Sequence, residues 1–187
     1  MDTYVNTIGF VGSFNVGKSS IISRYNDKKF NNNTSNTIGV DFNQVFDKLD
    51  DKDIRINIWD VSGNIRYRSI LHCYLRNCNN LVVVYDINDK NSKEYIMDWI
   101  KFCNEFIKDN CEIILVGNKT DIGKEVPMNL DMNLKTFKVS AKNGNNINEL
   151  FNYLKSKTKR MIKKNSIKKV KLKDNIKREC CGISMCI

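Results

Sequence analysis

Several features that would place this chain in other protein classes are missing from its 187 residues. No apolar run approaches the roughly 18 residues of a membrane-spanning helix. The N-terminal segment MDTYVNTIGFVG lacks the basic start of a signal peptide, and residue 2 is Asp rather than the Gly that N-myristoylation requires. There is no internal repeat. We therefore expect a cytosolic protein with one folded domain.

Cysteine is present seven times, but not at the spacing of a metal site. Three cysteines crowd the C-terminal end, and the other four are scattered through the chain: Cys73, Cys78, Cys103 and Cys111. The sequence predicts that these four are buried free thiols.

The net charge of +10 is confined to one end of the chain. Residues 1–154 hold 19 Lys and Arg and 19 Asp and Glu, whereas residues 155–187 hold 12 basic residues and two acids. A neutral body with a basic arm predicts an anionic partner for the arm, either a membrane surface or a nucleic acid.

Apolar runs of strand character alternate with helical patterns along the body. Strands are expected at 7–12, 40–49, 53–60, 81–87 and 112–119, with a hairpin turn at 50–52. Helices are expected after the first strand, across 96–107 and after Asn146, which could cap the last helix with Glu149. This order predicts an α/β layered fold with a mostly parallel sheet.

The octapeptide GSFNVGKS, residues 12–19, has the frame of a phosphate-binding loop. Gly12 and Gly17 permit backbone geometry that a side chain would block, so that successive N–H groups point at phosphates beside a helix N-terminus. Lys18 would neutralise the β- and γ-phosphates, and the Ser19 hydroxyl would bind Mg²⁺. The alternative, an ordinary glycine turn, is disfavoured because the loop lies between a predicted strand and a predicted helix.

Two further motifs follow apolar strands. In NKTD, residues 118–121, the Asp121 carboxylate can accept two hydrogens from guanine that adenine does not offer. In SAK, residues 140–142, a backbone N–H can reach guanine O6. Either motif alone is a weak indication of a guanine site. The two motifs in this order, each after a predicted strand, are a strong one.

Two segments complete the predicted site. In WDVSG, residues 59–63, Asp60 can hold the Mg²⁺ shell and Gly63 can offer its N–H to a γ-phosphate. In TIGVDF, residues 37–42, Thr37 is a candidate second Mg²⁺ ligand.

With these motifs the chain resembles the Ras-superfamily small GTPases, and within them the Rab branch, from about residue 6 to 160. TIGVDF, IWD, RYRSI and LVVVYDI are the Rab-like segments. The resemblance implies a three-layer P-loop fold: six strands, mostly parallel with one antiparallel, and helices on both faces. It also implies GTP or GDP with Mg²⁺ and two switch segments that order around the γ-phosphate.

The resemblance also assigns roles by position. The catalytic group would be Asn64, Gly63 and Lys18, and the Mg²⁺ ligands would be Ser19, Thr37 and Asp60. Effector proteins would read an aromatic patch of Phe42, Trp59 and Tyr74, for which core packing is the alternative. The nucleotide would be held by Gly12, Asn15, Val16, Gly17, Lys18, Ser19, Ser20, Phe30, Thr37, Gly63, Asn118, Lys119, Asp121, Ser140, Ala141 and Lys142, with Phe30 against the guanine edge.

Three departures from the family pattern stand out. Phe14 occupies a loop position where relatives carry a small residue, and bulk there crowds the γ-phosphate. Asn64 replaces the catalytic Gln and is one methylene shorter, although hydrolysis needs that amide to hold the attacking water. The segment from Asp121 to Ser140, which contains Pro127, is short, so we expect a truncated fourth helix.

These observations predict a Rab-like GTP-binding switch of vesicle traffic with weak hydrolysis. One rival is a GTP-locked membrane tether that does not cycle. Another is a basic-tailed nucleic-acid-binding protein, which we set aside because the tail lacks interleaved aromatics and ends in cysteines.

We predict a GTP-binding domain over 1–160 and a basic tail over 161–187. The tail is compatible with a solvated helix end, a linker or a membrane arm. Its ending, CCGISMCI, predicts prenylation at Cys180 and Cys181, although Ser184 stands where a C-a-a-X box needs Cys and Cys186 is penultimate. We expect a monomer that attaches peripherally to anionic membranes. Its expected partners are effectors, an exchange factor and escort or dissociation-inhibitor proteins.

Overall fold

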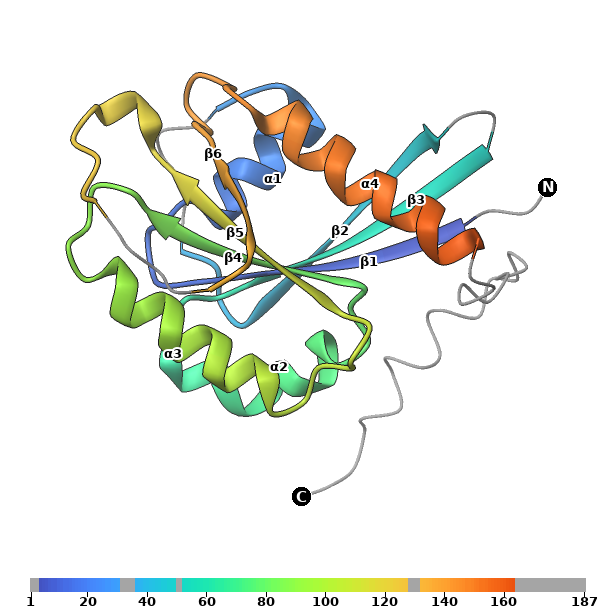
Figure 1. Cartoon of the computed structure of the whole chain (residues 1–187), viewed down its shortest axis with the longest axis horizontal. Coiled ribbons are helices and arrows are strands. Elements are labelled where there is room, and N and C mark those ends of the chain that lie inside the picture. Colours follow the sequence, from blue (N-terminus) through green and yellow to red (C-terminus); the bar gives the residue numbers. More distant parts are fainter. Residues whose placement is uncertain (1–3, 31–35, 50–51, 128–131, 164–187) are drawn as a thin grey trace.

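The computed structural model describes residues 4–30, 36–49, 52–127 and 132–163 (Figure 1). Its elements run in the order β1 (Tyr4–Val11), α1 (Lys18–Asp27), β2 (Val40–Leu49), β3 (Lys52–Val61), η1 (Ile65–Tyr67), α2 (Arg68–Leu75), β4 (Asn80–Asp86), α3 (Ser92–Asn104), β5 (Glu112–Asn118), η2 (Thr120–Ile122), β6 (Lys135–Lys138) and α4 (Ile147–Lys163).

The six strands form one sheet in the order β2-β3-β1-β4-β5-β6. β2 pairs antiparallel with β3, and every other pair is parallel. The predicted sheet is therefore confirmed. The tip of the β2–β3 hairpin, residues 50–51, lies outside the described residues.

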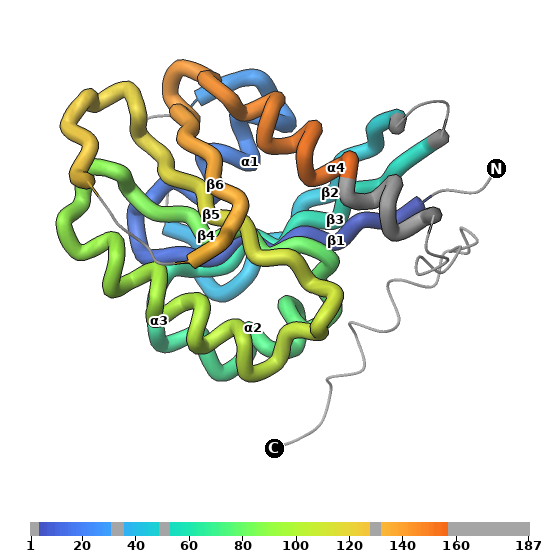
Figure 2. Tube along the Cα trace, viewed as in Figure 1, coloured from blue at the N-terminus to red at the C-terminus, as the bar shows by residue number. Residues whose placement is uncertain are grey.

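Helices cover both faces of the sheet, as predicted (Figures 1 and 2). On one face α1 and α4 enclose a core in which Tyr25 stacks on Phe151, with ring centroids 3.7 Å apart. On the other face α2 and α3 enclose a second core around Leu75, Trp99 and Cys103. The two cores arise because alternate residues of each strand point to opposite faces. Ile54, for example, lies in the first core.

The connection from β5 to β6 is short. Of its described residues, only the three-residue turn η2 is helical, and residues 128–131 lie outside the description. For the described part this confirms the expected truncation. The helix labelled α4 follows β6 and is the last helix in the described part of the chain.

One prediction about the cysteines is wrong. Cys78 and Cys103 are buried and Cys111 is half-buried, but Cys73 is exposed because it lies on the solvent side of the short helix α2. Burial raises the pKa of Cys103 and of Cys111 to about 12, so these thiols are poor nucleophiles.

In the described part of the chain, no helix is long and apolar enough to cross a membrane. α4 continues to Lys163, and the predicted tail beyond it, with Cys180, Cys181 and Cys186, lies outside the described residues.

Candidate functional site

The predicted motifs meet at the carboxyl edge of the sheet. The parallel strands all end at this edge, so the loops after β1, β3, β5 and β6 lie side by side (Figure 1). These are the loops that carry GSFNVGKS, WDVSG, NKTD and SAK.

The loop between β1 and α1 depends on its glycines. Gly12 has φ 140° and Gly17 has φ 94°, and a Cβ would lie 2.1 Å from Val84 O at Gly12 and 2.2 Å from Asn118 Nδ2 at Gly17. Neither position therefore tolerates a side chain. Asn15, between them, also has a positive φ of 59°.

Lys18 lies inside this loop. Its ammonium donates to Gly12 O at 3.0 Å and Ser13 O at 2.8 Å, and the side chain is buried. Burial lowers the pKa of Lys18 to about 8, although the nearby Asp60 carboxylate opposes the shift. A buried ammonium held by two carbonyls suits an incoming phosphate oxygen.

The three predicted Mg²⁺ ligands meet. Ser19 Oγ donates to Asp60 Oδ2 at 2.5 Å and lies 3.0 Å from Thr37 Oγ1. Asp60 is buried, and its other oxygen, Oδ1, has no hydrogen-bond partner among the described residues. Burial raises the pKa of Asp60, against the hydrogen bond from Ser19 and the charge of Lys18. Two hydroxyls and an under-satisfied carboxylate are a donor set that fits Mg²⁺, which would also relieve the cost of burying Asp60.

A small polar cavity opens between these groups. It is lined by Phe14, Asn15, Gly17, Lys18, Ser19, Ser20, Asn36, Thr37, Ser62 and Gly63. The Phe14 side chain is 57% exposed at the rim. Phe14 thus lines the predicted phosphate site, and more than half of its surface remains exposed.

Gly63 lies directly against the phosphate loop. A Cβ at this position would lie 2.4 Å from Phe14 N and 2.5 Å from Ser13 C. The backbone that carries the predicted γ-phosphate donor therefore touches the backbone of the residue that departs from the family pattern.

Asn64, the predicted catalytic amide, directly follows Gly63 at the edge of the cavity. Its side chain is exposed and does not line the cavity. The amide oxygen Oδ1 accepts the Arg66 N–H at 3.1 Å, so Asn64 caps the helical turn η1. The sequence contained an indication of this, because Asn is a preferred N-cap residue and Gln is not.

On the base side, Asn118 links three loops. Its Nδ2 donates to Val16 O at 2.8 Å, and its Oδ1 accepts the Ala141 N–H at 3.1 Å. The Asp121 carboxylate accepts a hydrogen bond from Ser140 Oγ at 2.6 Å, which orients it at the same edge.

Two lysines of these motifs differ in their surroundings. Lys119 has φ 71° and pairs with Asp86 at 2.9 Å. Burial opposes ionisation of Asp86, but hydrogen bonds from Asn88 and Lys119 outweigh it, so the pKa of Asp86 is lowered. The Lys142 side chain is exposed, and its backbone N–H has no protein partner among the described residues, which leaves it available to a base oxygen.

Phe30 is half-buried against the first core, and the Arg24 guanidinium lies 5.9 Å from its ring centroid. Arg24 was not among the predicted site residues. No motif marks it, because its role depends on contacts with a loop far along the chain.

The predicted aromatic patch is present. Phe42 and Trp59 have ring centroids 4.6 Å apart, and Trp59 and Tyr74 have centroids 5.0 Å apart. Phe42 is exposed, whereas Trp59 and Tyr74 are half-buried, so these two rings also serve the packing of α2 on the sheet.

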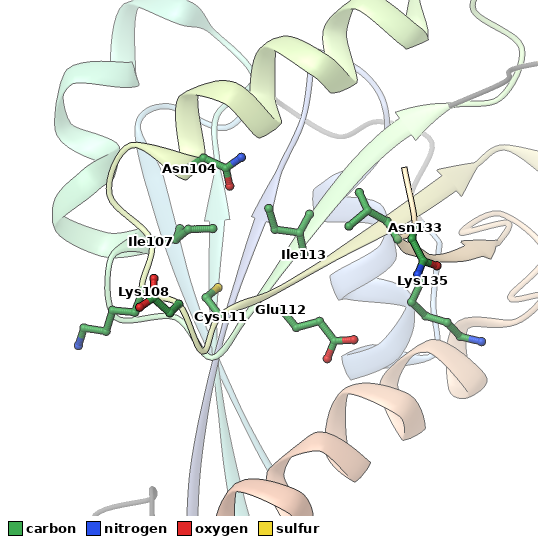
Figure 3. Close-up of a pocket in the computed structure, with 10 residues that line it drawn as sticks. Asn104, Ile107, Lys108, Cys111, Glu112, Ile113, Asn133 and Lys135 are labelled. Atoms are coloured by element: carbon green, nitrogen blue, oxygen red, sulfur yellow. The ribbon is translucent and has the colours of Figure 1, made fainter. Parts of the chain in front are cut away.

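A larger cavity of about 460 Å³ lies at the opposite end of β5 (Figure 3). It is bordered by Ile107 after α3, by Cys111 and Ile113 at the start of β5, and by Leu134 before β6. None of the predicted site residues lines it. We therefore place the functional site at the carboxyl edge, away from this cavity.

This fold, with a glycine loop around a buried lysine after β1, defines a P-loop nucleotide-binding protein. A family model described as the Ras family matches residues 8–160. Ras-related protein RabC of Dictyostelium discoideum is 33% identical over 187 residues, covering 91% of this chain and 94% of that protein. SEC4 of Saccharomyces cerevisiae is 32% identical over 148 residues, covering 75% and 69%, and Rab-26 of Rattus norvegicus is 33% identical over 187 residues, covering 94% and 72%. The chain belongs to the Ras family, in its Rab branch, and is a GTPase that binds GTP and GDP.

Proposed function

We propose that this GTPase is a Mg²⁺-dependent switch of membrane traffic whose hydrolysis is slow. The loop from Gly12 to Ser20 holds the phosphates, with Lys18 on the β- and γ-oxygens. Ser19, Thr37 and Asp60 would hold Mg²⁺, whose charge would offset that of the phosphates. Support comes from their mutual contacts and from the unpartnered Oδ1 of Asp60.

On the base side, Asn118 and Lys119 border guanine, Asp121 reads its N1 and N2 hydrogens, and the loop of Ser140, Ala141 and Lys142 meets O6. Phe30 lies against the guanine edge. When GTP is bound, effectors dock on Phe42, Trp59 and Tyr74. Exchange and escort proteins act on the same protein, and the basic tail with prenylated Cys180 and Cys181 attaches the monomer to anionic membranes.

The observation that carries slow hydrolysis is the rim of the phosphate cavity. Phe14 lines this cavity and its backbone N lies against Gly63, so we propose that its bulky ring hinders an arginine from an activating protein, while the Asn64 amide is engaged as a helix cap. Hydrolysis needs an oriented water and benefits from that arginine. Both requirements are compromised.

Single-turnover phosphate release tests the proposal. We expect an unaided rate at or below about 10⁻⁴ s⁻¹, with little acceleration by an arginine-finger activating protein. A rate that rises about 10⁵-fold with that protein would contradict slow hydrolysis. The same two residues favour a second candidate, a GTP-locked tether, which predicts no phosphate release over many hours.

A further inference from the structure

One guanidinium group, that of Arg24 on α1, connects three segments around the base side of the site. Its Nε donates to Ala141 O at 2.7 Å, its Nη2 donates to Lys142 O, and its Nη1 donates to Lys28 O at 2.8 Å. The first two carbonyls belong to the loop after β6, and the third belongs to the residue that ends α1. Arg24 therefore fixes both against the same helix.

The third segment is Phe30. The Arg24 Cζ atom lies 5.9 Å from the Phe30 ring centroid, within the range of a cation–π contact. Phe30 follows Lys28, whose φ of 56° is left-handed and sets the direction in which the chain leaves α1. The Lys28 carbonyl accepts a hydrogen bond from Arg24 Nη1, which holds the turn at the end of α1 in place.

Two side chains from other segments form hydrogen bonds with the loop after β6. The N–H of Ala141 donates to Asn118 Oδ1, while its C=O accepts from Arg24 Nε. Asn118 in turn donates to Val16 O in the phosphate loop. A continuous path of hydrogen bonds thus runs from the phosphate loop, through the loop after β6, to the far end of α1.

The chemistry of this contact favours arginine. Three carbonyls arranged around one side chain match the planar fork of a guanidinium, which presents five N–H donors in fixed directions. A lysine ammonium, a point charge on a flexible stem, cannot hold the same three acceptors in this geometry. The alternative is that Arg24 only stabilises the fold and has no effect on nucleotide binding.

We propose that Arg24 is a positioning residue for the guanine base: it sets the loop 140–142 and Phe30 around the base without contacting the nucleotide. The inference rests on the guanine site proposed above. Arg24 would affect binding of the base, whereas Lys18, Ser19 and Asp60 would affect binding of the phosphates and Mg²⁺. Arg24 should therefore affect GDP and GTP equally.

The test compares Arg24→Gln and Arg24→Lys with the wild-type chain, using dissociation rates of fluorescent GDP, GTP and IDP in excess Mg²⁺. IDP lacks the 2-amino group that Asp121 would read. The matched control is Arg76→Gln, since the Arg76 side chain is exposed and has no hydrogen bond or ion pair in the described part of the chain.

For Arg24→Gln we expect GDP and GTP to dissociate faster by the same factor, about tenfold, and the preference for GDP over IDP to shrink. The acceleration caused by EDTA should stay as in the wild type. Arg24→Lys should recover only part of the loss, and it provides the same comparison if Arg24→Gln does not fold.

Three outcomes would overturn the proposal. The first is a lower melting temperature with unchanged rates and an unchanged GDP to IDP ratio, which would make Arg24 only a structural link. The second is full recovery in Arg24→Lys, and the third is a larger effect on GTP than on GDP. If the wild-type chain itself does not prefer GDP to IDP, the guanine site fails rather than the role of Arg24.

Discussion

Ser19 Oγ lies 2.5 Å from Asp60 Oδ2, although the two residues are 41 positions apart in the chain. The contact joins the start of α1 to the end of β3, and Thr37 lies 3.0 Å from the same hydroxyl. Because Asp60 keeps a second, unpartnered oxygen in a buried place, the three groups form an incomplete polar cluster. A divalent cation would complete it.

The first prediction follows from this cluster. Ser19→Asn should weaken GTP binding at least about tenfold more than GDP binding, because the Ser19 hydroxyl would help to hold a Mg²⁺ ion whose charge offsets that of the γ-phosphate, and GDP has no γ-phosphate. Equilibrium titration with fluorescent GTP and GDP measures the two effects. Ser23→Ala, which removes a half-buried hydroxyl from the same helix that bonds Asp27 and does not line the cavity, is the control. If EDTA does not change the affinity of the wild-type protein for GTP, Ser19 is not a Mg²⁺ ligand.

The second prediction concerns base selection. Asp121→Asn replaces one carboxylate acceptor by an amide donor. Guanine nucleotides should then bind at least about 100-fold more weakly, and the affinity for xanthine nucleotides should rise. Competition of GDP and of xanthosine diphosphate against a fluorescent nucleotide measures this change in base preference. Equal affinity of the wild-type chain for ATP and GTP would rule out Asp121 as the selecting residue.

The sequence was sufficient to predict the sheet and the edge at which the motifs meet. Asp60 and Asn118 each end an apolar strand, and parallel strands end at one edge, so these two residues had to converge. The strand before Ser140, β6, is the largely exposed KTFK, and a sixth strand was expected only from the family resemblance. Local backbone rules likewise predicted the glycine loop, because Gly12 and Gly17 occupy positions with no room for a Cβ.

Contacts between distant segments were beyond sequence reasoning. Arg24 meets carbonyls 117 and 118 positions away, and nothing in α1 marks that meeting. Asn146 does precede the last helix, as predicted. However, its φ is 58° and its amide donates to Lys138 O at 2.8 Å, so it connects β6 to α4 instead of forming the expected capping box with Glu149.

A third prediction concerns acid stability. The Asp47 carboxylate on β2 accepts hydrogen bonds from Tyr25 on α1 at 2.9 Å and from Lys155 on α4 at 2.7 Å. Burial opposes ionisation of Asp47, but the hydrogen bonds outweigh it, and the pKa falls below its ordinary value of 3.8. A pKa that is lower in the folded than in the unfolded state adds stability above the unfolded pKa and loses it as the pH falls through the folded one.

Asp47→Asn should therefore lower the free energy of unfolding at pH 7 by about 1 kcal/mol, a modest value because solvent screens this partly exposed pair. The difference from the wild type should shrink as the pH falls below 4. Urea unfolding at several pH values measures it, with the exposed Asp109→Asn as control. A difference that persists undiminished in acid would mean that the loss is one of packing rather than of charge.

The fourth prediction concerns the tail. Two lipid chains, or one chain with a basic segment, are needed for stable anchoring, so Cys180→Ser with Cys181→Ser should move most of the protein to the soluble fraction. Cell fractionation reports this, and Cys73→Ser, an exposed cysteine of the folded domain, serves as control. If the double variant stays on membranes, Cys186 or a protein receptor carries the attachment.

The fifth prediction joins Phe14 and Asn64. Acceleration by an activating protein, about 10⁵-fold in ordinary relatives, corresponds to about 7 kcal/mol of barrier and needs both an oriented water and an inserted arginine. Phe14→Gly alone opens the rim but leaves an amide that caps η1. Asn64→Gln alone supplies the longer amide, removes a preferred cap residue and leaves the bulky Phe14 in the lining of the cavity. Since the two groups serve one transition state, their effects should be strongly non-additive.

We therefore expect each single variant to stay within about threefold of the wild-type rate, and the double variant to respond to an activating protein by orders of magnitude. Single-turnover phosphate release from the four proteins measures this. Phe46→Ala, which removes another exposed ring from β2, controls for loss of a surface phenylalanine. If the wild type already matches the double variant, with and without the activating protein, the Phe14 ring does not obstruct the γ-phosphate and the short Asn64 amide suffices to orient the water.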